Sequence, residues 1–192
     1  PITIRELLTH TSGFCYGFSN DTPLACLYQS RKTDFNPDDG ALADVVARLA
    51  TVPLLFQPGS SWNYGVSIDV LGHLIEVISG QALDVFLAER IFGPLGMEDT
   101  SFSIRGEKIS RFSSLYQATT ENPMELVDSR GESVYNKTVT TFSGGGGLLS
   151  TASDYFRFME MIRRALGGDS KQLLRTETVS NMTGNQLSGD LA

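Results

Sequence analysis

The chain has 192 residues and a formal net charge of −7, from 15 Lys and Arg against 22 Asp and Glu. Apolar residues make up 41% and charged residues 19%, which excludes a disordered type and allows a core in one domain or a large piece of one. The basic residues are scattered, so we expect no nucleic-acid partner, which would need a clustered basic face. No apolar stretch approaches the length of a membrane span.

The first predicted element is a short helix over residues 3–9. Its apolar residues fall on one face, and Thr3 followed by Glu6 forms a capping box. Gly13 suits the left-handed conformation that follows a helix end. Residues 14–39 carry Gly, Asn, Asp and Pro without a sustained period, which predicts mostly loop.

Three further helices are predicted over residues 41–50, 67–79 and 82–91, because their apolar residues recur at three- and four-residue steps. The clearest is 67–79, which Gly80 should end. Its expected buried stripe consists of Ile68, Leu71, Leu74, Ile75 and Ile78. Residues 93–97 read as a turn.

The second half of the chain has weaker signals. Residues 100–104 alternate like a strand, and residues 105–143 suggest loops with one or two short strands. A run of four glycines, 144–147, leads to Thr151 and Asp154, which form a second capping box at the start of a helix. The chain as a whole is predicted to be mainly helical with little strand.

Few side chains offer metal or thiol chemistry. His10 and His73 are far apart and lack the spacing of metal ligands. His10 closes the first helix, where the helix dipole favours a positive charge, and His73 is expected at or near the surface. Cys15 and Cys26 could pair, but free thiols are the favoured interpretation. We expect no metal and no cofactor.

The glycine run leaves two interpretations open. It lacks the Gly-Lys-Ser/Thr ending of a phosphate-binding loop. It could be a tight backbone segment packed beside another element, or a place where backbone approaches a substrate.

Tyr64 is the strongest candidate for chemistry. The turn at Pro58-Gly59 delivers Trp62 and Tyr64 to the start of the 67–79 helix. A Ser-His-Asp triad is not supported, because no Gly-x-Ser-x-Gly sequence occurs. A tyrosine, with an ordinary pKa of about 10, acts as a base only where cations or donors stabilise its phenolate. The alternative is an aromatic side chain that fills core beside Trp62.

Four segments carry a family resemblance. Residues 2–14 (Ile-Thr-Ile-Arg-Glu-Leu-Leu-Thr-His-Thr-Ser-Gly-Phe), 58–72, 80–102 and 144–158 resemble, in the same order, motifs of the serine β-lactamase-like family. That family includes class C β-lactamases, family VIII carboxylesterases and penicillin-binding proteins. The segments span nearly the whole chain, and several motifs in register are more specific than any one alone.

The resemblance implies an α+β, serine β-lactamase/transpeptidase-like fold, with residues 1–192 as the helix-rich middle of a single incomplete domain. It also implies an acyl-serine mechanism in which a serine of Ser-x-x-Lys attacks a carbonyl and Tyr64 relays protons. Neither Ser-x-x-Lys nor Lys-Thr-Gly occurs in these residues, so the chain alone is expected to be inactive. Val66 stands at a motif position where many relatives have Asn. Family VIII esterases tolerate another residue at this position.

The function implied is hydrolysis of small or short-acyl esters, with a small-molecule ester or amide as the only expected partner and the oligomeric state left open. Phe14 with the loop after it, Val66 and Gly145 are candidates to line the acyl pocket. The alternatives are a class C-type β-lactamase, a D-amino-acid peptidase, an acyltransferase, or a non-catalytic binding module.

Overall fold

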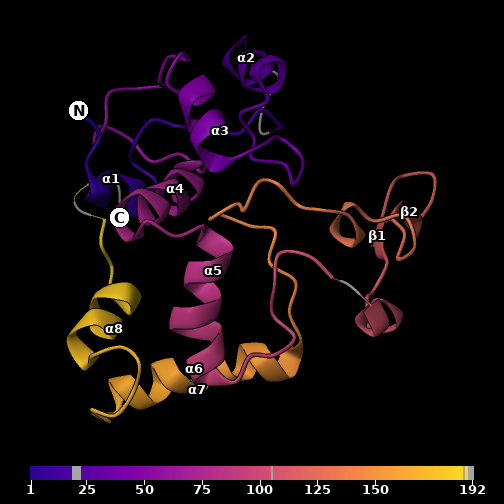
Figure 1. Ribbon diagram of the computed structural model, residues 1–192. Helices are drawn as coiled ribbons and strands as arrows, with labels where there is room; N and C mark the ends of the chain where they lie inside the picture. Colours follow the sequence, from indigo (N-terminus) through magenta and orange to yellow (C-terminus); the bar gives the residue numbers. More distant parts are fainter. Residues whose placement is uncertain (19–22, 105, 188, 190–192) are drawn as a thin grey trace.

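The computed structural model describes residues 1–18, 23–104, 106–187 and 189. In Figure 1, helices α1 to α4 form one group, α5 leads away from α4 towards α6 and α7, and α8 lies beside α7. The elements in chain order are α1 (Ile4–Leu8), α2 (Pro23–Arg31), α3 (Leu42–Leu49), α4 (Ser67–Ser79), α5 (Leu83–Leu87), α6 (Gly93–Leu95), β1 (Leu115–Gln117), β2 (Glu125–Asp128), α7 (Ala152–Leu166) and α8 (Thr176–Thr183).

Helix α1 begins as its capping residues predict. The Thr3 hydroxyl accepts a hydrogen bond from the Glu6 backbone N–H (3.3 Å), and the Glu6 carboxylate accepts one from the Thr3 backbone N–H (2.6 Å). Both ends of the capping box are therefore made, which confirms this prediction.

Helices α3 and α4 also lie where the apolar periodicity places them, and Gly80 ends α4 in the left-handed conformation at φ 70°. The buried face of α4 matches the predicted stripe only in part. Leu71 and Ile75 of the stripe are partly buried against the core, whereas Ile78 is exposed. The buried residues of the helix are Ser67, Asp69 and Gly72. Small and polar side chains turn inward because the first turns of α4 pack closely against backbone and form buried hydrogen bonds.

The prediction of mostly loop over residues 14–39 is wrong for residues 23–31, which form α2. Pro23 suits the first turn of a helix because its fixed φ is already helical. Tyr28 on this helix is fully buried in the core. Leu24 and Leu27 of the same helix pack against the core as well, so tertiary packing supports a helix that local periodicity does not reveal.

The helix predicted over residues 82–91 runs further than expected. Helix α5 continues through a π-helical turn, Ala88–Phe92, into α6, so the turn expected over 93–97 is largely helical. Gly96, at φ 65°, is the residue that ends it.

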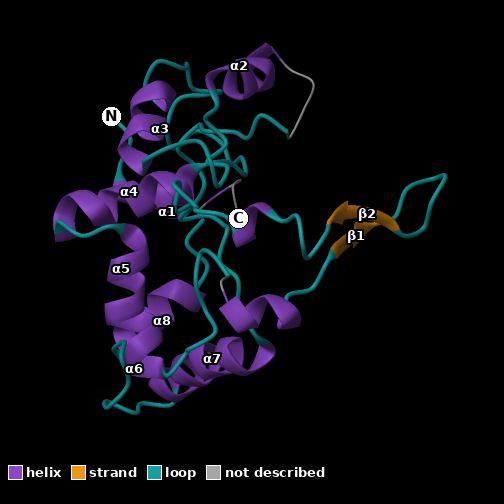
Figure 2. Cartoon of the chain, turned by 45° about the vertical axis from the view of Figure 1, so that its right-hand side comes forward, coloured by secondary structure: helices purple, strands orange, loops and turns teal. Residues whose placement is uncertain are grey.

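The strands are few among the described residues. β1 and β2 pair antiparallel in a hairpin that extends away from the helices (Figure 2), which confirms a short-strand prediction within 105–143. The strand expected over 100–104 is reduced to a single bridge between Ser101 and Leu149. Helix α8, which was not predicted, packs on α7 with Val179 fully buried.

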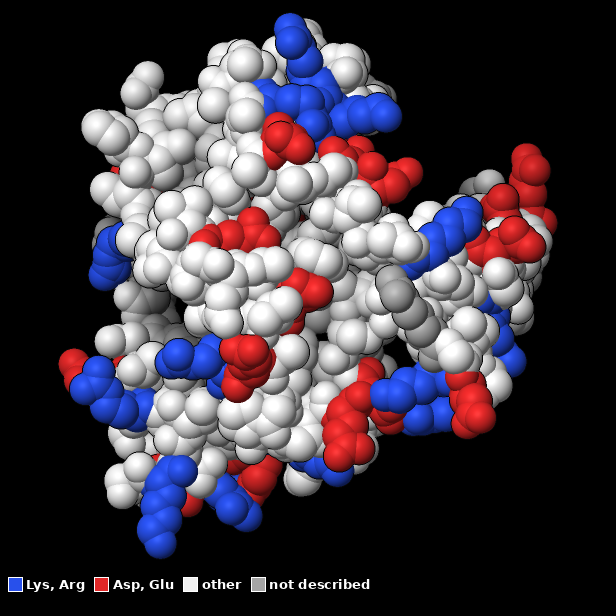
Figure 3. Space-filling model, in the orientation of Figure 1, with Lys and Arg blue, Asp and Glu red and all other residues white. Residues whose placement is uncertain are grey.

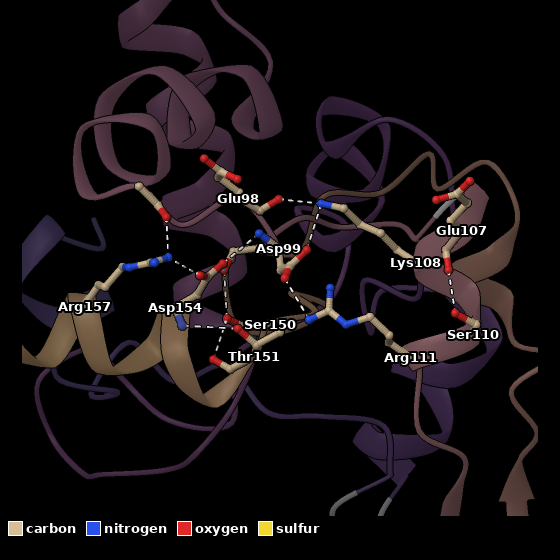
Figure 4. A network of polar contacts seen from close by, with 12 residues as sticks. Glu98, Asp99, Glu107, Lys108, Ser110, Arg111, Ser150, Thr151, Asp154 and Arg157 are labelled. Atoms are coloured by element: carbon tan, nitrogen blue, oxygen red, sulfur yellow. Dashed lines mark hydrogen bonds and ion pairs between the residues drawn. The ribbon is translucent and has the colours of Figure 1, made fainter.

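Helix α7 begins at half a capping box. The Thr151 hydroxyl accepts a hydrogen bond from the Asp154 backbone N–H (3.2 Å). The buried Asp154 carboxylate instead accepts from the Asp99 backbone N–H (2.7 Å), the Thr100 hydroxyl (3.1 Å) and Arg157 (2.7 Å), as Figure 4 shows. This carboxylate therefore ties α7 to the segment that follows α6.

Charged side chains of both signs are interspersed on the face drawn in Figure 3 and form no continuous basic surface there. Among the residues that the structure describes, no single helix is long and apolar enough to cross a membrane. Helix α4 and the α5–α6 stretch pass that test only as a pair, with a bend of 83° between them.

Candidate active site

Tyr64 lies in the loop between α3 and α4, and its side chain is 52% exposed. The centroid of its ring is 5.0 Å from that of His10 and 5.3 Å from that of Tyr16. Trp62, also half exposed, meets His10 edge-on at 6.3 Å. The alternative in which Tyr64 and Trp62 fill core is therefore wrong, because both rings reach the surface.

The loop that carries Tyr64 is held against the segment after α1. The Asn63 backbone N–H donates to the His10 carbonyl (3.0 Å), and the Asn63 side-chain amide donates to the Phe14 carbonyl (2.9 Å). At Gly65, a Cβ atom would lie 2.5 Å from the Phe14 carbonyl oxygen. Only glycine permits this approach, so the residues on both sides of Tyr64 are fixed to the same backbone segment.

Asp69, in the first turn of α4, is the main residue that the sequence analysis missed. It is 1% exposed and accepts hydrogen bonds from the Tyr16 hydroxyl (3.2 Å), the Ser143 hydroxyl and the Gly145 backbone N–H (3.1 Å). Burial raises the pKa of this carboxyl, while its three donors oppose the rise. The available signal was a carboxylate in the first turn of a mainly apolar helix, five residues after Tyr64.

The glycine run packs closely on α4. At Gly144 a Cβ atom would lie well under 3.0 Å from the Ile68 carbonyl oxygen, and the two glycines Gly72 and Gly144 approach each other backbone to backbone. The run is therefore a tight segment packed on α4, which confirms the first of the two interpretations; the approach of its backbone to a substrate stays a prediction.

The predicted pocket residues differ in their surroundings. Val66 has no exposed surface and Phe14 is 8% exposed, and both side chains pack in the core. That they line an acyl pocket stays a prediction. The Gly145 N–H is already donated to Asp69. Of the loop after Phe14, residues 19–22 lie outside the described part of the chain.

His10 differs from its sequence interpretation. Its backbone is in the left-handed region at φ 56°, and its buried Nδ1 has no hydrogen-bond partner among the described residues. Burial lowers the pKa of His10, which favours the neutral imidazole over the positive charge expected at a helix end. Beside Tyr64 it therefore offers an uncharged ring.

Other chemistry is sparse in the described residues. They contain no group of three His, Cys, Asp or Glu side chains placed to hold a metal ion. His73 lies within 3.5 Å of Glu76 on α4 and is partly buried. Cys15 is buried and Cys26 exposed, and both are free thiols, as predicted.

The chain is similar in sequence to several known proteins. The sequence model described as Beta-lactamase matches residues 1–190. Lovastatin esterase from Penicillium rubens is 32% identical over 199 residues, which cover 100% of this chain and 46% of the relative. Esterase EstB from Burkholderia gladioli is 32% identical over 176 residues (84% of this chain, 44% of EstB). Monacolin J acid methylbutanoyltransferase from Aspergillus terreus is 30% identical over 185 residues (94% and 41%).

Solved structures show the same fold. Simvastatin synthase (LovD) from Aspergillus terreus, in its unliganded selenomethionyl form, superposes with a TM-score of 0.74 at 27% identity over 99% of this chain and 45% of LovD. EstCE1, described as a hydrolase with promiscuous acyltransferase activity, gives a TM-score of 0.73 at 25% identity over 94% and 49%. The chain spans less than half the length of these relatives. It belongs to the Beta-lactamase family, and its helix-rich architecture is part of the serine β-lactamase/transpeptidase-like fold.

Proposed function

We propose that residues 1–192 are part of a longer carboxylesterase, called here the parent enzyme, that hydrolyses small or short-acyl esters through an acyl-serine intermediate. Tyr64 relays protons in this proposal. The observation that carries it is the half-exposed phenol of Tyr64, held between the rings of His10 and Tyr16 in a loop fixed by Asn63 and Gly65. A rigid, accessible phenol is what proton transfer at a surface groove requires.

The chemistry divides between Tyr64 and a serine outside these residues. In acylation the serine oxygen bonds to the ester carbonyl carbon, and the Tyr64 phenolate takes the serine proton. The same proton then passes to the leaving alcohol as its bond to the carbonyl carbon breaks. In deacylation, water replaces the serine oxygen by the reverse transfers. Residues 1–192 contain no Ser-x-x-Lys, so the nucleophile has to come from another part of the parent enzyme.

Esters are the favoured substrates for two reasons. Val66 occupies the position where β-lactam-hydrolysing relatives carry an amide, and its buried side chain offers no hydrogen bond to a substrate. In addition, two of the relatives reported above are named as esterases.

The direct test compares residues 1–192 with the parent enzyme on p-nitrophenyl butyrate, with nitrocefin assayed alongside. We expect ester turnover by the parent enzyme, blocked by a serine-directed phosphonate, and little nitrocefin hydrolysis. The chain alone should show no turnover, because a covalent nucleophile cannot be replaced by the remaining groups.

Two results would contradict the proposal. Phosphonate-sensitive turnover by residues 1–192 alone would place a nucleophile inside this chain. A folded parent enzyme that neither turns over esters nor reacts with the phosphonate would instead be a non-catalytic binding module.

Acyl transfer is the second candidate function, favoured by the methylbutanoyltransferase relative and by the similarity to EstCE1, a hydrolase with promiscuous acyltransferase activity. The same acyl-serine intermediate would be captured by an alcohol in place of water. The measurement is the ratio of transfer product to free acid when an alcohol acceptor is added to the p-nitrophenyl butyrate assay. A transferase gives mainly the new ester at millimolar acceptor, whereas a hydrolase continues to give mainly the acid.

A further inference from the structure

Tyr16 is a buried tyrosine placed directly beside Tyr64. It is 8% exposed, and its ring lies 5.3 Å from the Tyr64 ring at an interplanar angle of 51°. On its other side it stacks on Phe18 at 4.7 Å. Its hydroxyl donates a hydrogen bond to the Asp69 carboxylate at 3.2 Å. The ring and the hydroxyl are therefore both held in place next to the proposed proton relay.

We propose that Tyr16 is a positioning residue for Tyr64, whose hydroxyl turns from Asp69 to donate a hydrogen bond to the Tyr64 phenolate during acyl transfer. The inference deepens the proposed function and rests on it. It adds a residue that contacts Tyr64 and acts through it.

The contacts of Asp69 lower the energetic cost of moving the Tyr16 hydrogen bond from Asp69 to Tyr64. A hydroxyl carries one proton, so Tyr16 can donate either to Asp69 or to Tyr64 at one time. Its 3.2 Å contact with Asp69 is long for an O–H···O⁻ hydrogen bond, which is usually about 2.5–2.7 Å. When Tyr16 turns away, Asp69 keeps its donors Ser143 and Gly145 and stays satisfied.

Tyr16 holds its phenol proton more firmly than a free tyrosine does. Burial, followed by the charge of Asp69 and the neighbouring Tyr64 phenol, raises the pKa of Tyr16 well above that of a free tyrosine. Tyr16 therefore keeps its O–H bond throughout the cycle, and the exposed Tyr64 exchanges protons with the serine and the leaving alcohol. The other titratable ring in contact with Tyr64 is His10, whose pKa is lowered by burial. Because His10 is uncharged, it does not stabilise the proposed Tyr64 phenolate by charge. The hydrogen bond from the Tyr16 hydroxyl would supply that stabilisation.

The test is Tyr16→Phe in the parent enzyme, which keeps the ring and removes the hydroxyl. We expect kcat for p-nitrophenyl butyrate to fall about 10- to 100-fold with KM nearly unchanged, the usual effect of losing one hydrogen bond to a charged group. The acid limb of the kcat–pH profile should move to higher pH by about one to two pH units, because the variant lacks the donor proposed to stabilise negative charge on the Tyr64 oxygen. A purely structural role would leave that limb in place.

Matched variants separate the possible outcomes. Tyr135→Phe removes the hydroxyl of another partly buried tyrosine, which packs on Phe112, and should change neither kcat nor the profile. If Tyr16→Phe unfolds, 3-fluorotyrosine at position 16 keeps the hydroxyl as a stronger donor and should move the acid limb to lower pH. An unmoved limb in the folded Tyr16 variant overturns the inference. If the limb does not move but Tyr64→Phe abolishes turnover, only the inference about Tyr16 fails and the proposed function stands. If Tyr64→Phe is fully active, the proposed function and the inference about Tyr16 both fail.

Discussion

Tyr64→Phe in the parent enzyme is expected to lower kcat for ester hydrolysis by about 10²- to 10⁴-fold, with a small change in KM. In the proposed function the phenol oxygen receives the serine proton, so its removal would take away the relay and leave the binding surface. Because the side chain is 52% exposed, losing its hydroxyl should hardly alter stability. Steady-state kinetics with p-nitrophenyl butyrate measure the effect, and thermal unfolding checks the fold.

The matched control is Tyr155→Phe on α7, where an exposed tyrosine loses the same hydroxyl far along the chain from the candidate site. It should keep full activity. A Tyr64→Phe enzyme with kcat within a factor of three of the original would exclude this phenol as the proton relay, whatever the substrate.

The parts that the sequence predicted well have local causes. The Thr3–Glu6 capping box, the apolar periodicity of α3 and the left-handed glycine after α4 are all set within a few residues. The position of Tyr64 just before the N-terminus of α4 follows in the same way from the turn at Pro58-Gly59 and the start of the helix. Local chemistry is enough to place these features.

The parts that were wrong or missed depend on partners distant in the chain. Asp69 can be buried only because Ser143 and Gly145, more than seventy residues later, donate to it. Helix α2 has no useful apolar period, and it is held by core packing of Tyr28 with Leu24 and Leu27. Val66 lies beside Tyr64 in sequence but points into that core, since neighbouring residues at a helix start face different sides.

Gly144→Ala is expected to destabilise the protein by about 3 kcal/mol or more. The new Cβ would meet the Ile68 carbonyl oxygen and lie 3.1 Å from the backbone of Gly72, all atoms of α4 that cannot turn aside as a flexible side chain would. Relief requires the glycine run to move off the helix, which would also break the hydrogen bond from Gly145 to Asp69. Urea unfolding of the parent enzyme followed by circular dichroism measures the loss.

The control for this change lies two residues away. At Gly146 a Cβ atom would come no nearer than 3.7 Å to Ser143 Oγ, an ordinary contact. Gly146→Ala should therefore be neutral or stabilising by about 0.4–1 kcal/mol, because alanine has fewer conformations to lose on folding. If both substitutions lower the free energy of unfolding equally, the glycine run is not packed tightly against α4. Its packing would then not explain the burial of Asp69. If only Gly144→Ala is costly and ester turnover falls with it, the close packing of the run on α4 is what holds Asp69, and through it Tyr16, beside Tyr64.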